Sequence, residues 1–354
     1  MQLTGALLVD KPSGPTSHDI VAFARRLLQT SRIGHTGTLD PLATGLLVLL
    51  VGPATRLAQF LTGDEKEYIA DVRLGLSTPT YDAASLSDAR RPTSDVRLPT
   101  EAELDATLER FRGTFLQTPP AYSAKKVAGV AAYEKARRNQ AVDLKPVSVT
   151  VRELQVLPAS DVGPRTSGLG PRTSDLGPRT SDLEPRTSDV GRRTSDVGLL
   201  RLRVVATAGF YVRSLAHDLG QALGCGAHLE GLRRTRAGRF GVEDAATLDV
   251  LQAAGPAALD RLVTPNALLS DFPAVTLTPD GLRRAANGNP LAPSHLENGD
   301  SPRFLDPETG TGPVFRVTET GTGPVFRVLD ADGGVLAIAE HRADGLLHPV
   351  VVLR

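Results

Sequence analysis

The sequence has little cysteine and no long apolar run. Its 354 residues include one cysteine, Cys225, which excludes an intramolecular disulfide and a zinc site with four cysteine ligands. No apolar stretch approaches the roughly 20 residues that a membrane-spanning helix needs. The N-terminal apolar run has no basic stretch before it and is broken at Asp10 and Lys11, so we expect no signal peptide. These absences predict a protein of a reducing, cytoplasmic compartment.

The sequence also has no net charge, because 40 Lys and Arg residues balance 40 Asp and Glu residues. Hydrophobic residues make up 40% and charged residues 23%, which excludes wholesale disorder, and the length predicts two domains. Segments of opposite net charge make up this neutral total, since residues 201–240 have a net charge of +5 and residues 241–354 have a net charge of −7. The basic part contains an arginine cluster that predicts a phosphate-facing surface, with a solvated helix end as the alternative: Arg233, Arg234, Arg236 and Arg239.

Two tandem repeats interrupt the chain. Residues 163–197 are five copies of a seven-residue unit such as GPRTSDL, and four copies contain proline, which excludes a coiled coil and predicts a low-complexity insertion. The flanking stretches 148–157 and 199–209 are rich in β-branched residues, so we expect them to be neighbouring strands with the insertion as their loop. A second repeat, at 308–318 and 319–329, duplicates eleven residues, one copy of which is surplus to the fold.

Local patterns predict two helices near candidate sites. Apolar residues on one face predict a helix over 19–29, with Thr16 or Ser17 as its N-cap. A Thr-x-x-Glu capping box that starts at Thr100 predicts a helix over 101–112.

Other patterns predict strands. Alternation over 68–76 predicts a strand whose apolar face begins with Tyr68. Helical spacing after Phe210 places Tyr211 and Arg213 where a strand gives way to a helix.

The most unusual segment is GHTGTLDPLATGLLVLLVG, residues 34–52. Proline suits the first position of a helix and keeps the residue before it out of the helix, so Asp40 and Pro41 predict a helix that starts here. A carboxylate at a helix N-terminus stays ionised, which suits a nucleophile. From the spacing alone, an ordinary helix cap is the preferred interpretation of Asp40, and a loop histidine is that of His35.

Six segments in the same order resemble the TruB family of tRNA pseudouridine synthases. They are DKPSG at 10–14, the segment 34–52, KEYIADVRLG at 66–75, FRGTFLQTPPAYSAKKVAG at 111–129, GFYVRSLAHDLG at 209–220 and GCGAHLEGLRRTRAG at 224–238. The resemblance implies an α+β pseudouridine synthase fold with a mixed, mostly antiparallel sheet over residues 1–250. From about Phe272 the chain resembles the small β-rich PUA-like RNA-binding domain of that family, which implies a second domain over 272–354.

The resemblance also implies an activity. The family isomerises uridine-55 in the T loop of tRNA to pseudouridine, on a flipped-out base and with neither a metal nor an organic cofactor. Asp40 matches the nucleophile, which either adds to the uracil ring or captures the ribose. Tyr68 matches the tyrosine that stacks on the base and assists proton removal, although a core aromatic is the other interpretation. Arg213 matches the arginine that pairs with the catalytic carboxylate.

Further residues match positions around the substrate. Tyr211 and Leu232 match residues that line the uracil pocket, and His35 matches one that helps to hold the flipped loop. Lys11 lies in the lysine-proline turn of the family, where a structural role is the preferred interpretation.

Basic side chains are expected to contact the RNA backbone, which positions RNA without reading its bases. Segment 119–142 corresponds to a family region that closes over the RNA stem-loop. The expected contacts there and in the arginine cluster are Lys125, Lys126, Arg233 and Arg234.

Three features depart from the family pattern. The insertion at 163–197 has no counterpart, Pro79 stands where the family usually has an acidic residue, and the acidic tail would need a local patch to bind RNA. We expect a monomer that binds the tRNA T stem-loop without a membrane or an obligate protein partner. The alternatives are a guide-RNA-dependent rRNA pseudouridine synthase and a tRNA-folding chaperone. A generic protein with an Asp-Pro helix cap explains Asp40 but not six ordered segments.

Overall fold

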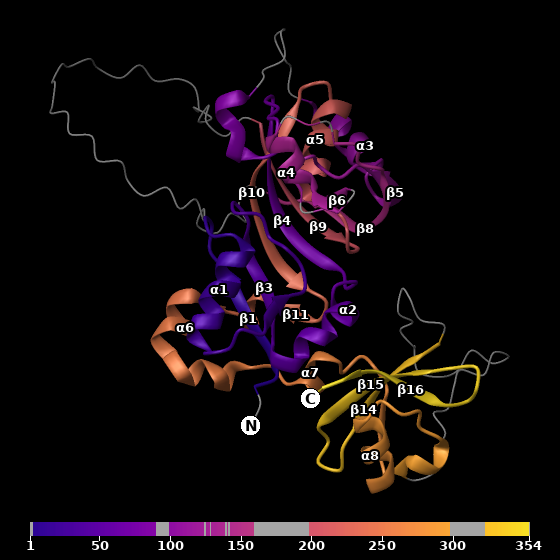
Figure 1. Ribbon diagram of the computed structural model, residues 1–354. Coiled ribbons are helices and arrows are strands. Elements are labelled where there is room, and N and C mark those ends of the chain that lie inside the picture. The colour runs from indigo at the N-terminus through magenta and orange to yellow at the C-terminus, as the bar shows by residue number, and fades with distance from the viewer. Residues whose placement is uncertain are drawn as a thin grey trace, which may run out of the picture. The chain divides into compact units, whose positions relative to one another are not determined.

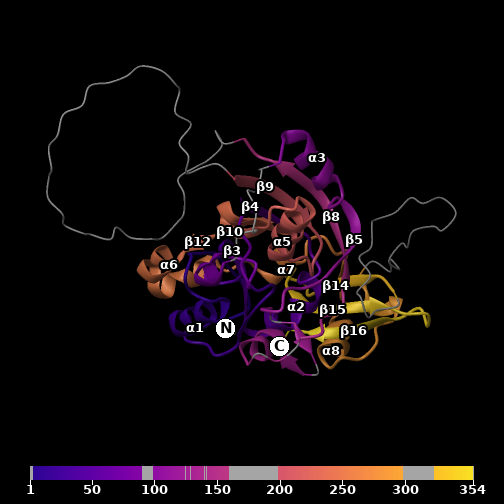
Figure 2. The ribbon, with the colours of Figure 1, turned by 90° about the horizontal axis from the view of Figure 1, so that it is seen from above.

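The computed structural model describes residues 3–89, 99–123, 125–127, 129–138, 140, 142–158, 198–297 and 323–353. The heptad array and the first copy of the eleven-residue repeat lie outside these residues. The chain divides into two compact units, of which the first comprises Met1–Asp64 and Thr235–Arg354 and the second Glu65–Arg234 (Figures 1 and 2).

The first unit is built on a mixed sheet. β1 (Gly5–Lys11) pairs antiparallel with β3 (Thr44–Val51) and parallel with β12 (Ala246–Thr247), and β2 (Ile33–His35) pairs antiparallel with β3. All eight residues of β3 are buried, which explains its run of leucine and valine. The mixed, mostly antiparallel sheet expected from the sequence is confirmed.

The helix expected after Asp40 is wrong. Pro41 lies in a turn, which the amide of Ala43 closes by donating to the Asp40 carbonyl at 3.0 Å, and the chain enters β3 at Thr44. A short run of buried apolar residues is compatible with a helix or a strand, and pairing with β1 decides for the strand. Asp40 therefore has no helix dipole behind it, and that argument for its ionisation does not apply.

Short helices complete the first unit. The helix expected at 19–29 is α1 (Ser17–Leu27), whose N-cap is Thr16; hydrogen bonds from Thr16 lower the pKa of Asp19. The others are η1 (Gly52–Leu57), α2 (Ala58–Leu61), η4 (Val242–Asp244), α6 (Leu248–Ala254), η5 (Gly255–Arg261), α7 (Pro265–Leu268), α8 (Pro279–Ala286) and η6 (Pro293–His295), and β11 (Phe240–Gly241) extends the sheet.

The C-terminal part of the first unit is rich in β-structure, as expected. Its described strands lie in the order β13 (Ala274–Thr276), β14 (Val325–Leu329), β15 (Val335–His341) and β16 (Leu347–Val352), with only β13 and β14 parallel. β14 comes from the second copy of the eleven-residue repeat. Phe326 and its neighbours form one buried cluster with residues around α8.

A second apolar cluster joins this small sheet to β1 and β3. Val325, Ile338 and Val351 share it with Leu, Val and Ala side chains of the two larger strands. The rings of Phe60 and Phe272 meet edge to face within it, with centroids 6.0 Å apart. Burial of this apolar area holds the C-terminal sheet against the N-terminal strands of the same unit.

The second unit has its own run of strands, in the order β10-β4-β9-β8-β5. They are β10 (Ala227–Ala237, of which 227–234 belong to this unit), β4 (Lys66–Leu74), β9 (Leu199–Ala206), β8 (Val147–Val156) and β5 (Gly113–Gln117). β8 and β9 are antiparallel neighbours, so the two strands expected on either side of the heptad array are confirmed.

Helices accompany these strands. The capping box at Thr100 is present, and α3 (Glu101–Glu109) ends three residues before the expected position. α5 (Val212–Ala222) follows the β9 strand as expected and packs against β4. The remaining elements are η2 (Ala83–Asp88), the hairpin of β6 (Lys126–Val127) and β7 (Val130–Ala131), and α4 (Ala132–Arg137).

The two faces of β4 differ in character. One face carries cross-strand ion pairs, each with a closest distance of 2.6 Å: Arg201 with Asp71, Arg203 with Glu67, and Arg73 with Glu230. On the other face Ala70 and Val72 are buried. The second unit thus uses many of its arginines within its own sheet.

α5 carries two partly buried polar residues, His217 and Asp218. The rings of Tyr81 and His217 stack with centroids 3.8 Å apart. Burial lowers the pKa of His217 and raises that of Tyr81, to which the charge of Asp218 adds. Burial also raises the pKa of Asp218 to about 6. Each shift opposes the charged form of the side chain.

Asp218→Asn is expected to stabilise the protein at pH 8 and not at pH 4. The raised pKa means that the folded state holds a proton more tightly than the unfolded chain, so stability is lost as the pH rises through about 6. Asparagine is neutral throughout and avoids this loss, which solvent screening of the partly exposed carboxyl group reduces to the order of 1 kcal/mol. Thermal unfolding at both pH values measures it, with exposed Asp105→Asn as control. An equal gain at both pH values would contradict the expectation.

Gly220→Ala is expected to destabilise the second unit. A Cβ at this position of α5 would lie 2.1 Å from the amide nitrogen of Ala227 and 2.4 Å from the carbonyl carbon of Gly226, so backbone must shift. Overpacking of this kind costs about 1–3 kcal/mol. Gly63→Ala, where nothing lies within 4 Å of the new Cβ, is the matched control. Equal melting temperatures for the two variants would show that α5 and the start of β10 can separate at no cost.

Candidate active site

Asp40 lies in the loop between β2 and β3 and is partly buried, and hydrogen bonds fix the residues on either side of it. On one side, the Ser17 hydroxyl accepts from the amide of Leu39 at 2.8 Å and lies 3.0 Å from its carbonyl, to which it donates. On the other side, the amide of Gly14 donates to the carbonyl of Pro41 at 2.8 Å. The backbone that carries the Asp40 carboxylate is therefore held at both ends.

The side chain of Lys11 binds the same loop. Its side chain is fully buried, and its ammonium donates to the carbonyls of Pro12 (2.9 Å), Pro41 (3.3 Å) and Ala43 (2.6 Å). A buried ammonium is tolerated only when its N–H groups have acceptors, and three carbonyls match its three donors. Lys11 thus binds the turn that follows Asp40, in line with the structural role preferred from the sequence.

His35 ends β2, and its backbone pairs with Leu49 of β3. Its imidazole is partly buried and meets that of His18 edge to face, with centroids 6.0 Å apart. The first unit therefore places Lys11 and His35 on the two strands β1 and β2 that pair with β3, and Asp40 on the loop that leads into β3.

Arg213 lies in the first turn of α5, and its side chain is 6% exposed. Its guanidinium donates to the carbonyls of Thr80 (3.2 Å) and Tyr122 (2.8 Å) and lies 3.6 Å from a carboxylate oxygen of Asp82. Asp82 was missed by the sequence reasoning. The signal was the Thr-x-Thr-x-Asp pattern before η2, since Asp82 is the N-cap of that short helix.

The loop around Pro79 is well organised despite its departure from the family pattern. The hydroxyl of Thr78 donates to the Asp82 carbonyl at 2.7 Å, and that of Thr80 donates to the Asp82 carboxylate at 2.6 Å. The amide of Ala84 donates to the same carboxylate oxygen at 3.0 Å. These bonds leave the second oxygen of Asp82 directed at Arg213.

Tyr211 is the N-cap residue of α5, and β5 fixes its backbone. The side-chain amide of Gln117 donates to the Tyr211 carbonyl at 3.1 Å and accepts from the Tyr211 amide at 2.8 Å. Beside this pair, the Ser214 hydroxyl donates to the carbonyl of Thr118 at 2.8 Å. No local sequence pattern indicates this role of Gln117, because its partner is distant along the chain.

Tyr68 and Arg234 are brought together. Tyr68 on β4 is partly buried, and Arg234 on the neighbouring β10 is 3% exposed and hydrogen-bonded through its side chain to that of Tyr68. Burial lowers the pKa of Arg234, and the bond to Tyr68 opposes that shift. The Arg234 guanidinium is enclosed, which does not favour the expected contact with a phosphate, and that contact stays a prediction. Leu232, two residues earlier on β10, is partly buried.

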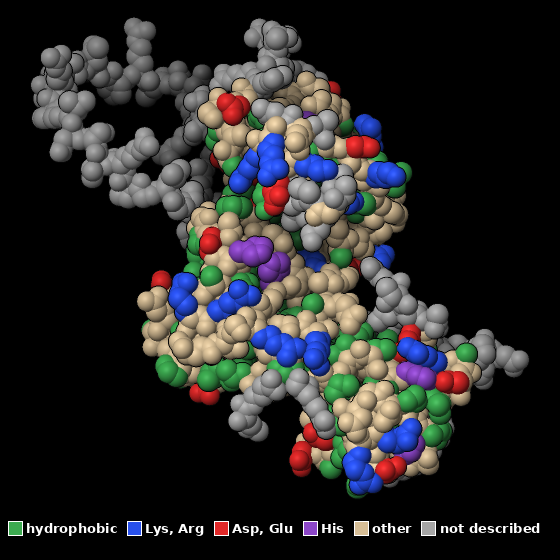
Figure 3. Space-filling view, in the orientation of Figure 1, with side chains coloured by type: hydrophobic (Ala, Val, Ile, Leu, Met, Phe, Trp, Pro, Cys, Tyr) green, Lys and Arg blue, Asp and Glu red, His purple; other side chains and the backbone are tan. Residues whose placement is uncertain are grey.

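Other basic residues remain at the surface. Arg233 and Lys125 are partly exposed; Lys126 lies in β6, and its side chain is outside the part that the structure describes. Arg137 and Arg138, at the end of α4, are exposed. Figure 3 shows blue Lys and Arg side chains gathered on the surface over α4. Basic surface therefore accompanies the segment expected to approach RNA.

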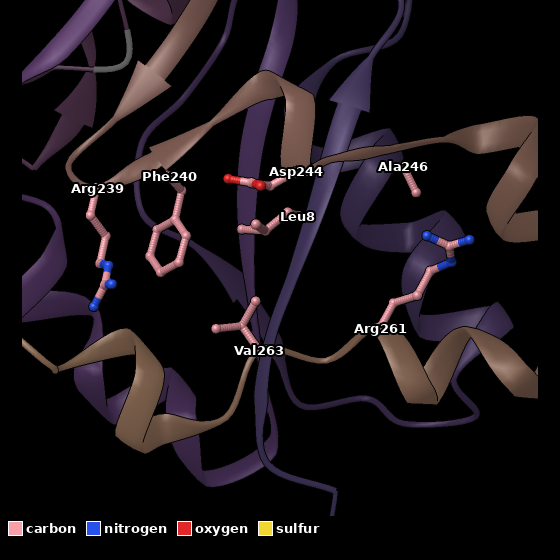
Figure 4. A pocket seen from close by; sticks show the side chains of 7 residues that line it. All are labelled: Leu8, Arg239, Phe240, Asp244, Ala246, Arg261 and Val263. Atoms are coloured by element: carbon pink, nitrogen blue, oxygen red, sulfur yellow. The ribbon is translucent and has the colours of Figure 1, made fainter.

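A cavity of about 320 Å³ lies elsewhere in the first unit and contains none of the catalytic or substrate-binding candidates (Figure 4). Its lining side chains are Leu8, Arg239, Phe240, Asp244, Ala246, Arg261 and Val263. Among the residues that the structure describes, no group of three or more His, Cys, Asp or Glu side chains is placed to hold a metal ion. Within the same residues, no helix has the length and apolar character to cross a membrane.

Comparison with known structures supports the fold. The chain superposes on the archaeal box H/ACA sRNP Nop10-Cbf5 complex with a TM-score of 0.61 and 20% identity, covering 99% of this chain and 86% of that one. A structure of an H/ACA RNP bound to a substrate RNA containing 2'-deoxyuridine gives a TM-score of 0.60 and 21% identity, covering 99% and 85%. At these identities the likeness concerns the fold alone.

Comparison of sequences shows the family. The N-terminal domain of the TruB family pseudouridylate synthases matches residues 25–163, and the C-terminal domain of tRNA pseudouridylate synthase B matches residues 213–268. A protein of Solibacter usitatus named tRNA pseudouridine synthase B is 40% identical, covering 99% of this chain and 100% of its own length. One of that name from Thermobifida fusca is also 40% identical, covering 98% of each chain. The chain therefore belongs to the TruB family of pseudouridine synthases.

Proposed function

We propose that this protein isomerises uridine-55 in the T loop of tRNA to pseudouridine, with Asp40 as the nucleophile. The observation that carries the proposal is the arrangement around Asp40: a carboxylate on a loop whose backbone is fixed by the buried side chains of Ser17 and Lys11. A reacting group has to be held in place while the base is detached, turned and rejoined.

The reaction exchanges one glycosidic bond for another. The bond between the ribose and the ring nitrogen breaks, and a bond between the ribose and the fifth ring carbon forms. The proton on that carbon leaves, and the freed ring nitrogen takes up a proton, so that the product is an isomer of the substrate. The Asp40 carboxylate starts the exchange by adding to the ring or by capturing the ribose. Tyr68 stacks on the base and assists proton removal, and Tyr211, Leu232 and His35 complete the surroundings of the flipped uridine.

Arg213 is proposed to keep the Asp40 carboxylate ionised and oriented during the reaction. In the second unit its guanidinium is bound by two backbone carbonyls and Asp82. A guanidinium presents its five N–H groups in a rigid planar fork, so these contacts fix the plane of the Arg213 side chain. Asp82 is accordingly proposed as a residue that holds Arg213.

Binding of the T stem-loop is proposed to rest on backbone contacts by Lys125, Lys126 and Arg233, with residues 119–142 closing over the RNA. Residues 1–250 form the catalytic domain in this proposal, and residues 272–354 form an RNA-binding domain. The enzyme is proposed to act in the cytoplasm as a monomer, with no guide RNA, metal, organic cofactor or obligate protein partner. A guide-dependent enzyme and a folding chaperone are the competing functions.

Asp40→Asn is expected to abolish the reaction while tRNA binding persists. The purified protein, with excess EDTA and no added RNA guide, should release tritium from a tRNA transcript labelled at the fifth ring carbon of uridine. The amide of asparagine is not a comparable nucleophile, so release should fall by at least about 10⁴-fold. Equal rates for the variant and the wild type would disprove the role of Asp40.

Controls separate the competing functions. Asp249→Asn changes an exposed carboxylate of α6 and should leave the rate unchanged. A transcript with cytidine at position 55 should release no tritium; undiminished release would contradict the choice of uridine. Activity that appears only with a guide RNA would favour the guide-dependent enzyme. Faster tRNA refolding without any tritium release would favour the chaperone.

Lys11→Met is expected to weaken both the fold and the reaction. The substitution keeps the length of the side chain and removes the donor from the carbonyls of Pro41 and Ala43, which costs about 1–3 kcal/mol. Loosening of the Asp40 loop should lower kcat on the order of 100-fold. Lys145→Met, at an exposed lysine, is the matched control. A normal kcat together with a lowered melting temperature would mean that the loop keeps its shape without Lys11.

A further inference from the structure

Gln117 is the last residue of β5, and its side chain is almost fully enclosed. It is 1% exposed, although glutamine is usually a surface residue. Enclosure of a primary amide is costly unless its N–H and C=O groups have partners. The partners here are both backbone groups of one residue, Tyr211, at 3.1 Å and 2.8 Å. The side chain therefore pairs with that backbone as a neighbouring strand would.

The two bonds act on the residue that begins α5. Tyr211 has extended backbone angles, with φ −113° and ψ 110°, and its side chain makes no capping bond. Its carbonyl also accepts from the amide of Leu215 at 3.1 Å, the first helical bond of α5. Gly209, two residues before Tyr211, has a φ of 83°, a turn that favours glycine. The Gln117 amide thus binds both backbone groups of the residue that links this turn to α5.

We infer that Gln117 is a positioning residue for the reaction, acting through the backbone of Tyr211 to set the place of the Tyr211 ring against the target uridine. The inference rests on the proposed function, which assigns the Tyr211 ring to the uracil pocket. Gln117 itself touches no substrate. Hydrogen bonds to both the N–H and the C=O of Tyr211 restrain its backbone angles φ and ψ. This restraint also limits where its Cα–Cβ bond, and hence its ring, can point.

Glutamine is well suited to this position. Asparagine is one methylene shorter, and glutamate lacks the donor that the Tyr211 carbonyl accepts from. Methionine has a similar length and lacks both hydrogen-bonding groups. Ser214 supplies a matched control, since its hydroxyl also ties α5 to the chain after β5, through a hydrogen bond to the Thr118 carbonyl in which Tyr211 takes no part.

The experiment compares Gln117→Met and Ser214→Ala with the wild type in the tritium-release assay on unmodified tRNA transcript. Gln117→Met should lower kcat about 10-fold to 100-fold, because the base is misplaced for the rejoining step. Its KM for tRNA should stay within about threefold, because phosphate contacts supply most of the binding. Ser214→Ala should change kcat less than about threefold. Equal losses of kcat in the two variants, in proportion to lowered melting temperatures, would overturn the inference and leave Gln117 as a docking residue.

A second variant keeps the test informative if Gln117→Met fails to fold. In Gln117→Glu the ionised carboxylate faces the Tyr211 carbonyl, whereas the protonated acid can donate to it and still accept from the Tyr211 amide. Burial raises the pKa of a carboxyl group, so kcat relative to the wild type should recover at least about fivefold between pH 8 and pH 6. A ratio that does not change with pH would overturn the inference. Absence of activity in the wild type is a separate result, which would count against the proposed function instead.

Discussion

The burial of one ammonium group constrains the loop that carries Asp40. Lys11 ends β1, and the antiparallel pairing of β1 with β3 puts it opposite Gly45, next to the turn. Once the charge is enclosed there, its N–H groups need acceptors, and the carbonyls of Pro41 and Ala43 supply them. The turn therefore takes the shape that presents those carbonyls. The position of the Asp40 backbone thus follows from a strand register and a desolvation penalty, with Ser17 fixing the residue before it.

The second unit places its candidate residues by the same physical means. Arg213 is bound by two carbonyls and a carboxylate, and Tyr211 by both polar groups of Gln117. In each case a buried polar side chain binds backbone groups of a loop or of the residue that begins a helix. Such groups would be costly without partners, so the fold and the site require the same hydrogen bonds. Asp82 and Gln117 take part in this way without any implied contact with substrate.

The sequence predicted what depends on near neighbours. The caps at Thr16 and Thr100 are local hydrogen bonds, and the pairing of β8 with β9 followed from two similar stretches around an unlike insertion. The helix after Asp40 was wrong because a buried apolar run has no period that separates helix from strand, and the partner β1 decided. Asp82 and Gln117 were missed because their partners lie far along the chain. The residue roles taken from the family resemblance stay predictions.

The number of basic residues in a segment does not predict how many of them are available to RNA. The +5 segment predicted a phosphate-facing surface, yet several of its arginines serve the second unit itself. Arg201 and Arg203 pair with Asp71 and Glu67, and Arg234 is enclosed against Tyr68. A positive segment therefore does not measure the charge available to RNA, since each guanidinium with a carboxylate partner has already lost most of its attraction for a phosphate. Attraction for the RNA backbone has to come from side chains that stay at the surface, such as Arg137 and Arg138 at the end of α4. The zero net charge of the chain is compatible with this, because pairs within the sheet cancel without affecting the remaining surface.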